Sequence, residues 1–202
     1  MTKLIGITGR SGSGKGLACE IFARHGIPAI DTDAVYHEIL AAPGACTDEL
    51  AKAFGTEILG DDGLVDRKRL SGAVFSKKNT PALLHTLNTI THKYIMAKSY
   101  DLLRALSEAG ATAVLLDAPQ LFEAHLEAEC DLVLGVIAED EHCIKRIMAR
   151  DGLTRERAMA RLGAQHSNDF FRTHCTAVIE NNSTAEDLER AICQFMHEFG
   201  VK

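Results

Sequence analysis

Short apolar runs alternate with segments of helical spacing at the start of the chain, and this order predicts a parallel α/β sheet. Lys3–Thr8 is apolar and β-branched, and a glycine-rich stretch separates it from residues 17–23, which have helical spacing up to Gly26. Ile27–Ile30 is a short second strand, and a second helix is predicted over Ala34–Leu40. Strands and helices in this alternation are typical of a parallel sheet covered by helices.

The middle of the chain, about residues 34–109, is almost wholly helical in its pattern. Between about Pro81 and Ala109 the apolar residues recur every three or four positions, which predicts one long helix or two with a single buried face. We therefore expect a helical insertion over 34–109, placed between two parts of one α/β core.

Three more apolar runs follow the insertion and complete the predicted sheet. They are Ala113–Leu116, Leu132–Ile137 and Ala177–Ile179, and the second is continuous, as expected for a strand that is buried on both faces. Residues 139–167 are rich in arginine and helical in pattern, and Thr184–Phe199 reads as a final helix with its first residue as N-cap. The sequence thus predicts five strands in one domain over 1–202. The core covers 1–33, 110–138 and 175–202, and 139–174 forms a second insertion.

Composition narrows the class of protein. The chain has 202 residues, 46% of them hydrophobic and 25% charged, which are ordinary globular values, and no apolar run approaches the roughly 20 residues of a membrane span. The net charge of −6 and the 5% aromatic content argue against a nucleic-acid surface. The six cysteines form no C-x-x-C pair, and the first residues lack a signal-peptide layout, so we expect reduced thiols in a cytoplasmic protein without nucleic-acid or membrane partners.

The glycine-rich stretch carries the most specific motif. Gly9–Lys15 reads G-R-S-G-S-G-K and fits G-x-x-x-x-G-K between a predicted strand and a predicted helix, which is the context of a phosphate-binding loop. Glycines let backbone N–H groups approach a polyphosphate, and the lysine adds a mobile positive charge. The predicted ATP-binding residues of this segment are Gly12, Ser13, Gly14, Lys15, Gly16 and Leu17.

One position of the motif departs from its usual chemistry. The residue after the lysine is normally Ser or Thr, whose hydroxyl binds Mg²⁺, and here it is Gly16. The nucleotide cradle is retained, but one metal ligand is lost. We expect ATP and Mg²⁺ as cofactors, with a weakened metal site.

Three aspartates lie at the predicted strand ends, where open parallel sheets bind ligands. Asp31 and Asp33 follow the second strand, and a kinase needs a carboxylate to accept the hydroxyl proton of its substrate, so Asp33 is the candidate base and Asp31 a supporting residue. The alternative is that Asp33 only caps the helix that follows. Asp117 ends the third strand, where an aspartate often holds Mg²⁺ through water; the alternative is a plain polar strand end.

Basic side chains supply further candidates. Arg146 and Arg150 are four residues apart and so share one helix face, from which they could stabilise the charge of a transferred phosphoryl group. Arginine-rich helices are also commonly solvated faces. His37, one turn after Asp33, and Arg67 are weaker candidates for contact with an acceptor. A half-exposed structural histidine explains His37 somewhat better, and a solvated helix start explains Arg67 equally well.

Several segments, taken in order from about residue 3 to 190, are similar to the dephospho-CoA kinase family. They are residues 5–9 with the phosphate loop, 30–33, 63–70, Leu87–His92, Leu116–Glu123, Arg146–Asp151, Gln165 and Val178–Asn182. The phosphate loop alone is widespread among proteins, whereas the ordered set is specific.

The resemblance implies a three-layer core with parallel strand order 2-3-1-4-5, a helical CoA-binding insertion and an arginine-bearing lid. It implies transfer of the γ-phosphoryl group of ATP to the ribose 3′-hydroxyl of dephospho-CoA, with Asp33 as base and Asn181 near the adenine. It also implies that the substrate meets Asp31, Asp33, His37, Arg67, His92 and Pro119. Gly16 replaces the family's Ser or Thr, and Arg10 replaces its usual small residue.

Two alternatives remain at the level of sequence. One is another small-molecule kinase of the same architecture, such as a nucleoside or nucleoside-monophosphate kinase. The other is a nucleotide-binding module that is catalytically weak because of Gly16. The oligomeric state is open between a monomer and a weak homo-oligomer.

Overall fold

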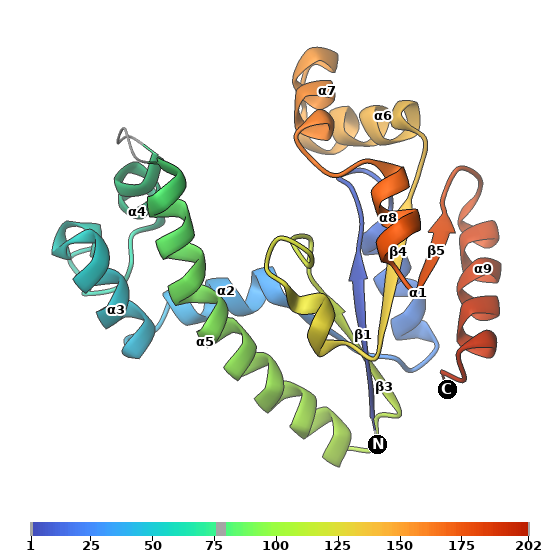
Figure 1. Ribbon diagram of the computed structural model, residues 1–202, viewed down its shortest axis with the longest axis horizontal. Helices are drawn as coiled ribbons and strands as arrows, with labels where there is room; N and C mark the ends of the chain where they lie inside the picture. The colour runs from blue at the N-terminus through green and yellow to red at the C-terminus, as the bar shows by residue number, and fades with distance from the viewer. Residues whose placement is uncertain (1, 76–79, 202) are drawn as a thin grey trace. The chain divides into compact units, whose positions relative to one another are not determined.

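The computed structural model describes residues 2–75 and 80–201. Their contacts divide the chain into two compact units, one formed by Met1–Ile30 and Ala105–Lys202 and the other by Asp31–Arg104. We call the first the nucleotide unit and the second the helical unit. Figure 1 traces both along the chain.

The nucleotide unit is built on a five-stranded sheet with the order β2-β3-β1-β4-β5. This order confirms the fold that the family resemblance implied. The strands are β1 (Lys3–Thr8), β2 (Ala29–Asp31), β3 (Ala113–Asp117), β4 (Leu132–Ile137) and β5 (Ala177–Glu180).

The register of the sheet brings the ends of its strands to one edge. β1 pairs in parallel with β3 and β4, and β4 pairs in parallel with β5. Ile7 lies opposite Asp117, and Ile137 lies opposite Glu180. Segments that leave β1, β3, β4 and β5 therefore start next to one another, at what we call the carboxyl edge. Crevices at this edge are where open α/β sheets bind ligands.

Helices cover both faces of this sheet. On one face, α1 (Lys15–Arg24) and α9 (Ala185–Glu198) pack on a core that includes Ile5 and Leu134, both fully buried. On the other face, Phe171 of α8 (Asn168–His174) lies against Gly135 of β4. A three-layer arrangement results, as predicted.

The predicted final helix begins with the expected cap. The Thr184 hydroxyl accepts a hydrogen bond from the Asp187 N–H, and the Asp187 carboxylate accepts one from the Thr184 N–H. This reciprocal pair satisfies two N–H groups that the helix itself leaves without partners.

The arginine-rich segment 139–174 forms three helices. They are α6 (Asp140–Asp151), α7 (Arg155–Gly163) and α8, and the first two pack through a small cluster that includes the buried residues Ile147 and Leu162. Helix α6 follows β4 directly, so it starts at the carboxyl edge. A short 3₁₀ turn, Leu126–Glu129, lies between β3 and β4.

The helical unit has a hydrophobic core of its own. Its helices are α2 (Thr32–Leu40), α3 (Ala45–Phe54), α4 (Arg67–Phe75) and most of α5 (Thr80–Glu108), with a 3₁₀ turn at Thr56–Ile58. Leu50, Ile58 and Val74 are fully buried in this core. The segment after Pro81 is one long helix, which settles the choice between one helix and two.

Two boundaries differ from the sequence prediction for a local reason. We expected a strand over Ile27–Ile30 and a helix from Ala34, but β2 runs to Asp31 and α2 starts at Thr32. The Asp31 carboxylate accepts hydrogen bonds from the Asp33 and Ala34 N–H groups, at 2.9 and 3.0 Å. Asp31 is therefore the N-cap, and the cap ends the strand there.

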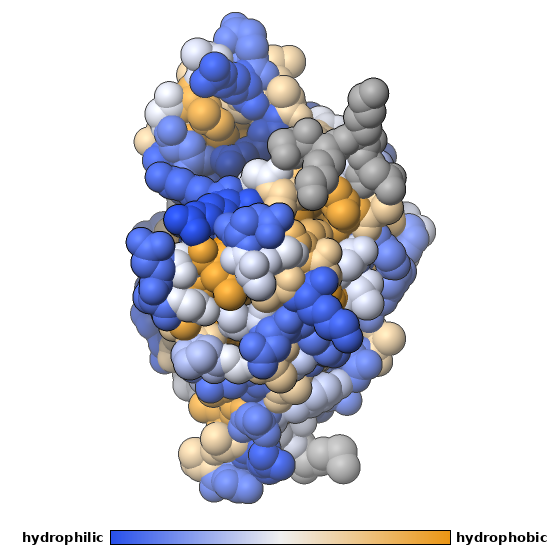
Figure 2. All heavy atoms as spheres, turned by 90° about the vertical axis from the view of Figure 1, so that its left-hand side faces the viewer, coloured by the Kyte–Doolittle hydropathy of each residue, from blue (hydrophilic) through white to orange (hydrophobic). Residues whose placement is uncertain are grey.

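Hydrophilic side chains cover most of the face shown in Figure 2, where hydrophobic ones form only small separate areas. Three large hydrophobic side chains are exposed in the described chain, those of Phe75, Tyr100 and Met159. No helix within the described residues has the length and hydropathy needed to cross a membrane.

Candidate active site

The glycine-rich loop joins β1 to α1 at the carboxyl edge and needs glycine at two of its turns. Gly12 and Gly14 have φ of +77° and +99°, which L-amino acids with a Cβ rarely adopt. A Cβ at Gly12 would lie 2.5 Å from the Cys143 carbonyl oxygen of α6, and one at Gly14 would collide with the Asn181 side chain. The glycines thus permit both the loop conformation and the close approach of its neighbours.

Two side chains hold the carbonyl groups of this loop. The Arg146 guanidinium donates to the Gly12 and Ser13 carbonyls, at 3.2 and 3.1 Å, and to the Asn181 carbonyl at 3.0 Å. The Asn181 amide donates to the Ser13 carbonyl at 2.8 Å. Because the C=O and N–H of one peptide group point in opposite directions, fixing the Ser13 carbonyl turns the Gly14 N–H the other way. Side chains from two other segments thus hold the backbone of the loop.

Lys15 and Asp117 lie together at the same edge. The Lys15 ammonium forms an ion pair with Asp117, and their side chains are only 16% and 15% exposed. The second carboxylate oxygen of Asp117 accepts from the Cys19 thiol at 3.5 Å. The lysine predicted for phosphate and the aspartate predicted for the metal are thus immediate neighbours.

Gly16 follows Lys15 in the first turn of α1. It is exposed, and a Cβ added there would meet no atom within 4 Å. Nothing steric in the described chain therefore demands glycine at this position. Leu17, the next residue, packs against the core of the nucleotide unit and has a structural role.

The residues present fit a magnesium ion that is held mainly by a nucleotide. Mg²⁺ commonly binds through one or two carboxylates, substrate phosphates and several waters. Asp117 offers one carboxylate beside the loop, and no group of three or more His, Cys, Asp or Glu side chains among the described residues forms an all-protein metal site.

Arg150 differs from Arg146, although both belong to α6. Its side chain is 62% exposed, and its guanidinium donates to both carboxylate oxygens of Asp151, at 2.7 and 2.9 Å. Hydrogen bonds from Arg150, with the charge of Arg161, lower the pKa of Asp151 to about 2. The structure therefore brings Arg146 to the loop and places Arg150 in a surface ion pair.

The predicted acceptor residues of the helical unit lie on the surface of its first helix. Asp33 and His37 are exposed in consecutive turns of α2. Since Asp31 provides the N-cap, the alternative in which Asp33 caps this helix is wrong.

A cavity of about 650 Å³ in the helical unit contains another predicted residue. Arg67, Lys68 and Ser71 of α4 line it together with Tyr36 and three apolar side chains. Burial raises the pKa of Tyr36, and the nearby Arg67 charge opposes this shift. Cations beside apolar groups can bind a long ligand with an anionic part.

Two other predicted substrate residues lie in partly buried positions. His92 is half-buried on α5, and burial lowers the pKa of its imidazole, which favours the neutral ring. The Pro119 carbonyl accepts a hydrogen bond from the Thr8 hydroxyl at 3.5 Å, beside the end of β1.

The sequence prediction gave no site role to Arg10, which belongs to the loop, or to Gln165, which contacts it. Arg10 donates to Asp140 and to the Leu162 carbonyl, and Gln165 accepts from the Ser11 N–H. The charged side chain of Arg10 inside a glycine-rich loop indicated that it has partners. That these partners lie in α6 and α7 could not be predicted, because only the fold brings these helices to the loop.

A parallel sheet with a glycine-rich loop, a lysine and an aspartate at its carboxyl edge defines a phosphate-loop nucleotide-binding protein. The family model for dephospho-CoA kinase matches residues 3–187. The chain belongs to this family, and its activity is the ATP-dependent phosphorylation of dephospho-CoA to coenzyme A.

Two dephospho-CoA kinases agree with this assignment, and a further solved protein shares the fold. A dephospho-CoA kinase of Lactobacillus johnsonii is 33% identical over 99% of this chain and 100% of its own length. A solved protein of Thermus thermophilus is 34% identical, with a TM-score of 0.79 over 98% of this chain and 97% of its own. A dephospho-CoA kinase of Campylobacter jejuni is 26% identical, with a TM-score of 0.71 over 98% of each chain. The nucleoside-kinase alternative is thereby set aside.

Proposed function

We propose that the chain transfers the γ-phosphoryl group of ATP to the ribose 3′-hydroxyl of dephospho-CoA, with the loop Gly9–Lys15 as its phosphate cradle. The observation that carries this proposal is the set of hydrogen bonds from Arg146 and Asn181 to the loop carbonyls. They turn a loop N–H away from the protein side, toward the place where phosphates bind in loops of this type.

Lys15 neutralises charge on the transferred group. Its ammonium forms an ion pair with Asp117, and the ATP phosphates compete for it when they bind. Arg146 holds the cradle in shape. Arg150 contributes only if its guanidinium leaves Asp151, so its effect is smaller than that of Arg146.

Asp33 accepts the proton of the attacking hydroxyl. Its place in the first turn of α2 is fixed by the Asp31 cap. His37, Arg67, His92 and Pro119 contact dephospho-CoA, with Arg67 meeting an anionic part of it beside the cavity of the helical unit.

Mg²⁺ bound with ATP would be held by Asp117, directly or through water, since Gly16 offers no side chain. Its chemical contribution is to neutralise the charge that develops on the β- and γ-phosphates.

Asn181, whose side chain contacts the loop, lies near the adenine.

A second candidate function, nucleotide binding with little turnover, is favoured by one observation, the missing hydroxyl at Gly16. A turnover assay with ATP, Mg²⁺ and a panel of acceptors separates the two. Dephospho-CoA should have a higher kcat/KM than adenosine, cytidine or UMP. A faster reaction of any of these three would refute the assigned substrate, and ATP binding without turnover would support the module.

The same preparation tests the assembly. We propose that the protein acts in the cytoplasm as a monomer or weak homo-oligomer. Sedimentation at the concentration of the assay should give the mass of a monomer, and a stable assembly that is required for activity would contradict this.

A further inference from the structure

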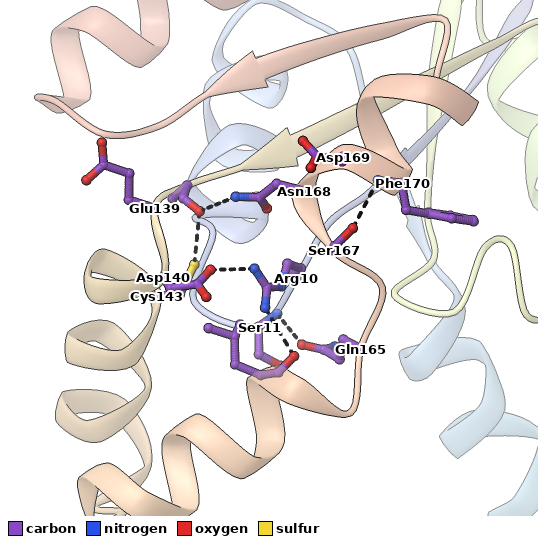
Figure 3. A network of polar contacts seen from close by, with 12 residues as sticks. Arg10, Ser11, Glu139, Asp140, Cys143, Gln165, Ser167, Asn168, Asp169 and Phe170 are labelled. Atoms are coloured by element: carbon purple, nitrogen blue, oxygen red, sulfur yellow. Dashed lines mark hydrogen bonds and ion pairs between the residues drawn. The ribbon is translucent and has the colours of Figure 1, made fainter.

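Arg10 is a buried arginine inside the phosphate loop. It is 8% exposed, and its guanidinium bridges two helices of the segment 139–174 (Figure 3). One terminal nitrogen donates to Asp140 Oδ1 at 2.6 Å, in the first turn of α6. The other donates to the Leu162 carbonyl at 3.2 Å, in the last turn of α7. A cation at a helix C-terminus also interacts favourably with the helix dipole.

The two ends of the Arg10 bridge differ in their exposure to water. Asp140 is 64% exposed and can be solvated without Arg10, whereas Arg10 is buried in the loop. A buried charge needs its partners, so Arg10 keeps the start of α6 and the end of α7 against the loop. The next residue adds a contact of the same kind, because the Ser11 N–H donates to Gln165 Oε1 at 2.9 Å, just beyond α7.

Helix α6 is also the helix that carries Arg146. Between Arg10's partner Asp140 and Arg146, the backbone of Cys143 lies against Gly12. One stretch of α6 therefore touches the loop at three successive points. A shift of its first turn would move Arg146 away from the Gly12 and Ser13 carbonyls.

We propose that Arg10 is a positioning residue, which acts through Arg146 to hold the phosphate loop in its nucleotide-binding shape. The inference rests on the proposed binding of ATP phosphates by this loop. A planar guanidinium can serve Asp140 and Leu162 at once, which the single ammonium of lysine does less well.

The test measures binding of a non-hydrolysable ATP analogue by calorimetry, together with steady-state kinetics. Arg10→Ala should weaken analogue binding and raise the KM for ATP by about tenfold, the effect of losing one charge-assisted interaction. The KM for dephospho-CoA should stay unchanged. Arg10→Lys should recover part of the loss.

A double-mutant cycle decides whether Arg10 acts through Arg146. In an Arg146→Ala background, Arg10→Ala should weaken analogue binding by less than twofold. Arg155→Ala is the matched control, since Arg155 joins α7 to Glu141 of α6 in an exposed ion pair without touching the loop. It should leave analogue binding unchanged.

Three results would overturn the inference. They are analogue binding by Arg10→Ala within twofold of the unmodified protein, an undiminished effect in the Arg146→Ala background, and an equal loss in Arg155→Ala. If Arg10→Ala does not fold, Arg10→Lys replaces it, and analogue binding equal to that of the unmodified protein would overturn the inference. Failure of the unmodified protein to bind the analogue would instead refute the proposed function.

Discussion

The two units of the chain present their candidate chemistry in different physical forms. In the nucleotide unit, side chains such as Arg146 and Asn181 bind the backbone of the loop and thereby shape it. In the helical unit, Asp33, His37 and Arg67 are exposed side chains on α2 and α4. In the proposed function, phosphate recognition is thus built into a backbone conformation, whereas acceptor recognition depends on individual side chains. Substitutions in the two units should separate ATP binding from acceptor use.

The largest effect should come from the helical unit. Asp33→Asn removes the proposed proton acceptor, and loss of a general base typically lowers kcat by about 10²–10⁴-fold. Affinity for an ATP analogue should be unchanged, because the loop is untouched. Single-turnover kinetics with saturating ATP would measure the effect.

Asp31→Asn is the matched control, two residues earlier. Asparagine is as good an N-cap as aspartate, so α2 should start at the same residue and kcat should fall far less. Equal losses of kcat in both variants would mean that Asp33 has a structural role. The helical unit would then not supply the proton acceptor.

A second substitution addresses the nucleotide unit. Arg146→Ala removes three hydrogen bonds to backbone carbonyls, and we expect ATP binding to weaken and kcat to fall by about 10²-fold, the effect of losing several hydrogen bonds from a charged group. Arg150→Ala, one turn along α6, removes only a surface ion pair and should lower kcat by no more than about tenfold. Similar losses from both would show that Arg150 leaves Asp151 during the reaction.

The sequence predicted the nucleotide unit well, because its signals are local. Continuous apolar runs indicated β1, β3 and β4. The spacing of the glycines and the lysine in Gly9–Lys15 is the motif of a phosphate-binding loop, so the sequence alone predicts that loop. It did not separate Arg146 from Arg150, since a four-residue spacing places both on one helix face but does not tell how far that face extends over the loop.

Local sequence patterns also could not identify residues whose partners are distant in the chain. The contact from Arg10 to Leu162 joins residues 152 positions apart, and only the parallel sheet brings their segments together. The Asp31 cap illustrates a closer miss. Both Asp31 and Asp33 suit an N-cap, and the choice followed from where β2 ends.

A third prediction returns to the helical unit with a moderate effect. Arg67→Ala should raise the KM for dephospho-CoA by about tenfold, because a cation beside the cavity meets an anionic part of the substrate. The KM for ATP should not change. Lys52→Ala, on the exposed surface of α3, removes the same charge away from the cavity and should leave both constants unaltered. If the two variants act alike, the substrate senses only overall charge.

The smallest effect is expected from substitution of Gly16, which follows the loop in the first turn of α1. Because a Cβ there meets nothing within 4 Å, serine can be introduced without displacing a neighbour, and its hydroxyl supplies the missing oxygen ligand. Gly16→Ser should lower the Mg²⁺ concentration for half-maximal activity and raise kcat by a few-fold at most, since water already fills such positions in many Mg²⁺ sites. Titration of activity with Mg²⁺ at saturating ATP would measure both.

Gly16→Ala separates the hydroxyl from the helix. Alanine in place of glycine stabilises a helix by up to about 1 kcal/mol and offers no ligand, so it should raise thermal stability without shifting the Mg²⁺ titration. If alanine and serine shift the Mg²⁺ titration equally, the metal ion is held without a ligand at position 16. The shift is then caused by the greater rigidity of α1 in both variants. If serine abolishes activity, the neighbouring Lys15–Asp117 ion pair requires glycine at position 16. The C-terminal end of the loop is then as constrained as the part that contains Arg10.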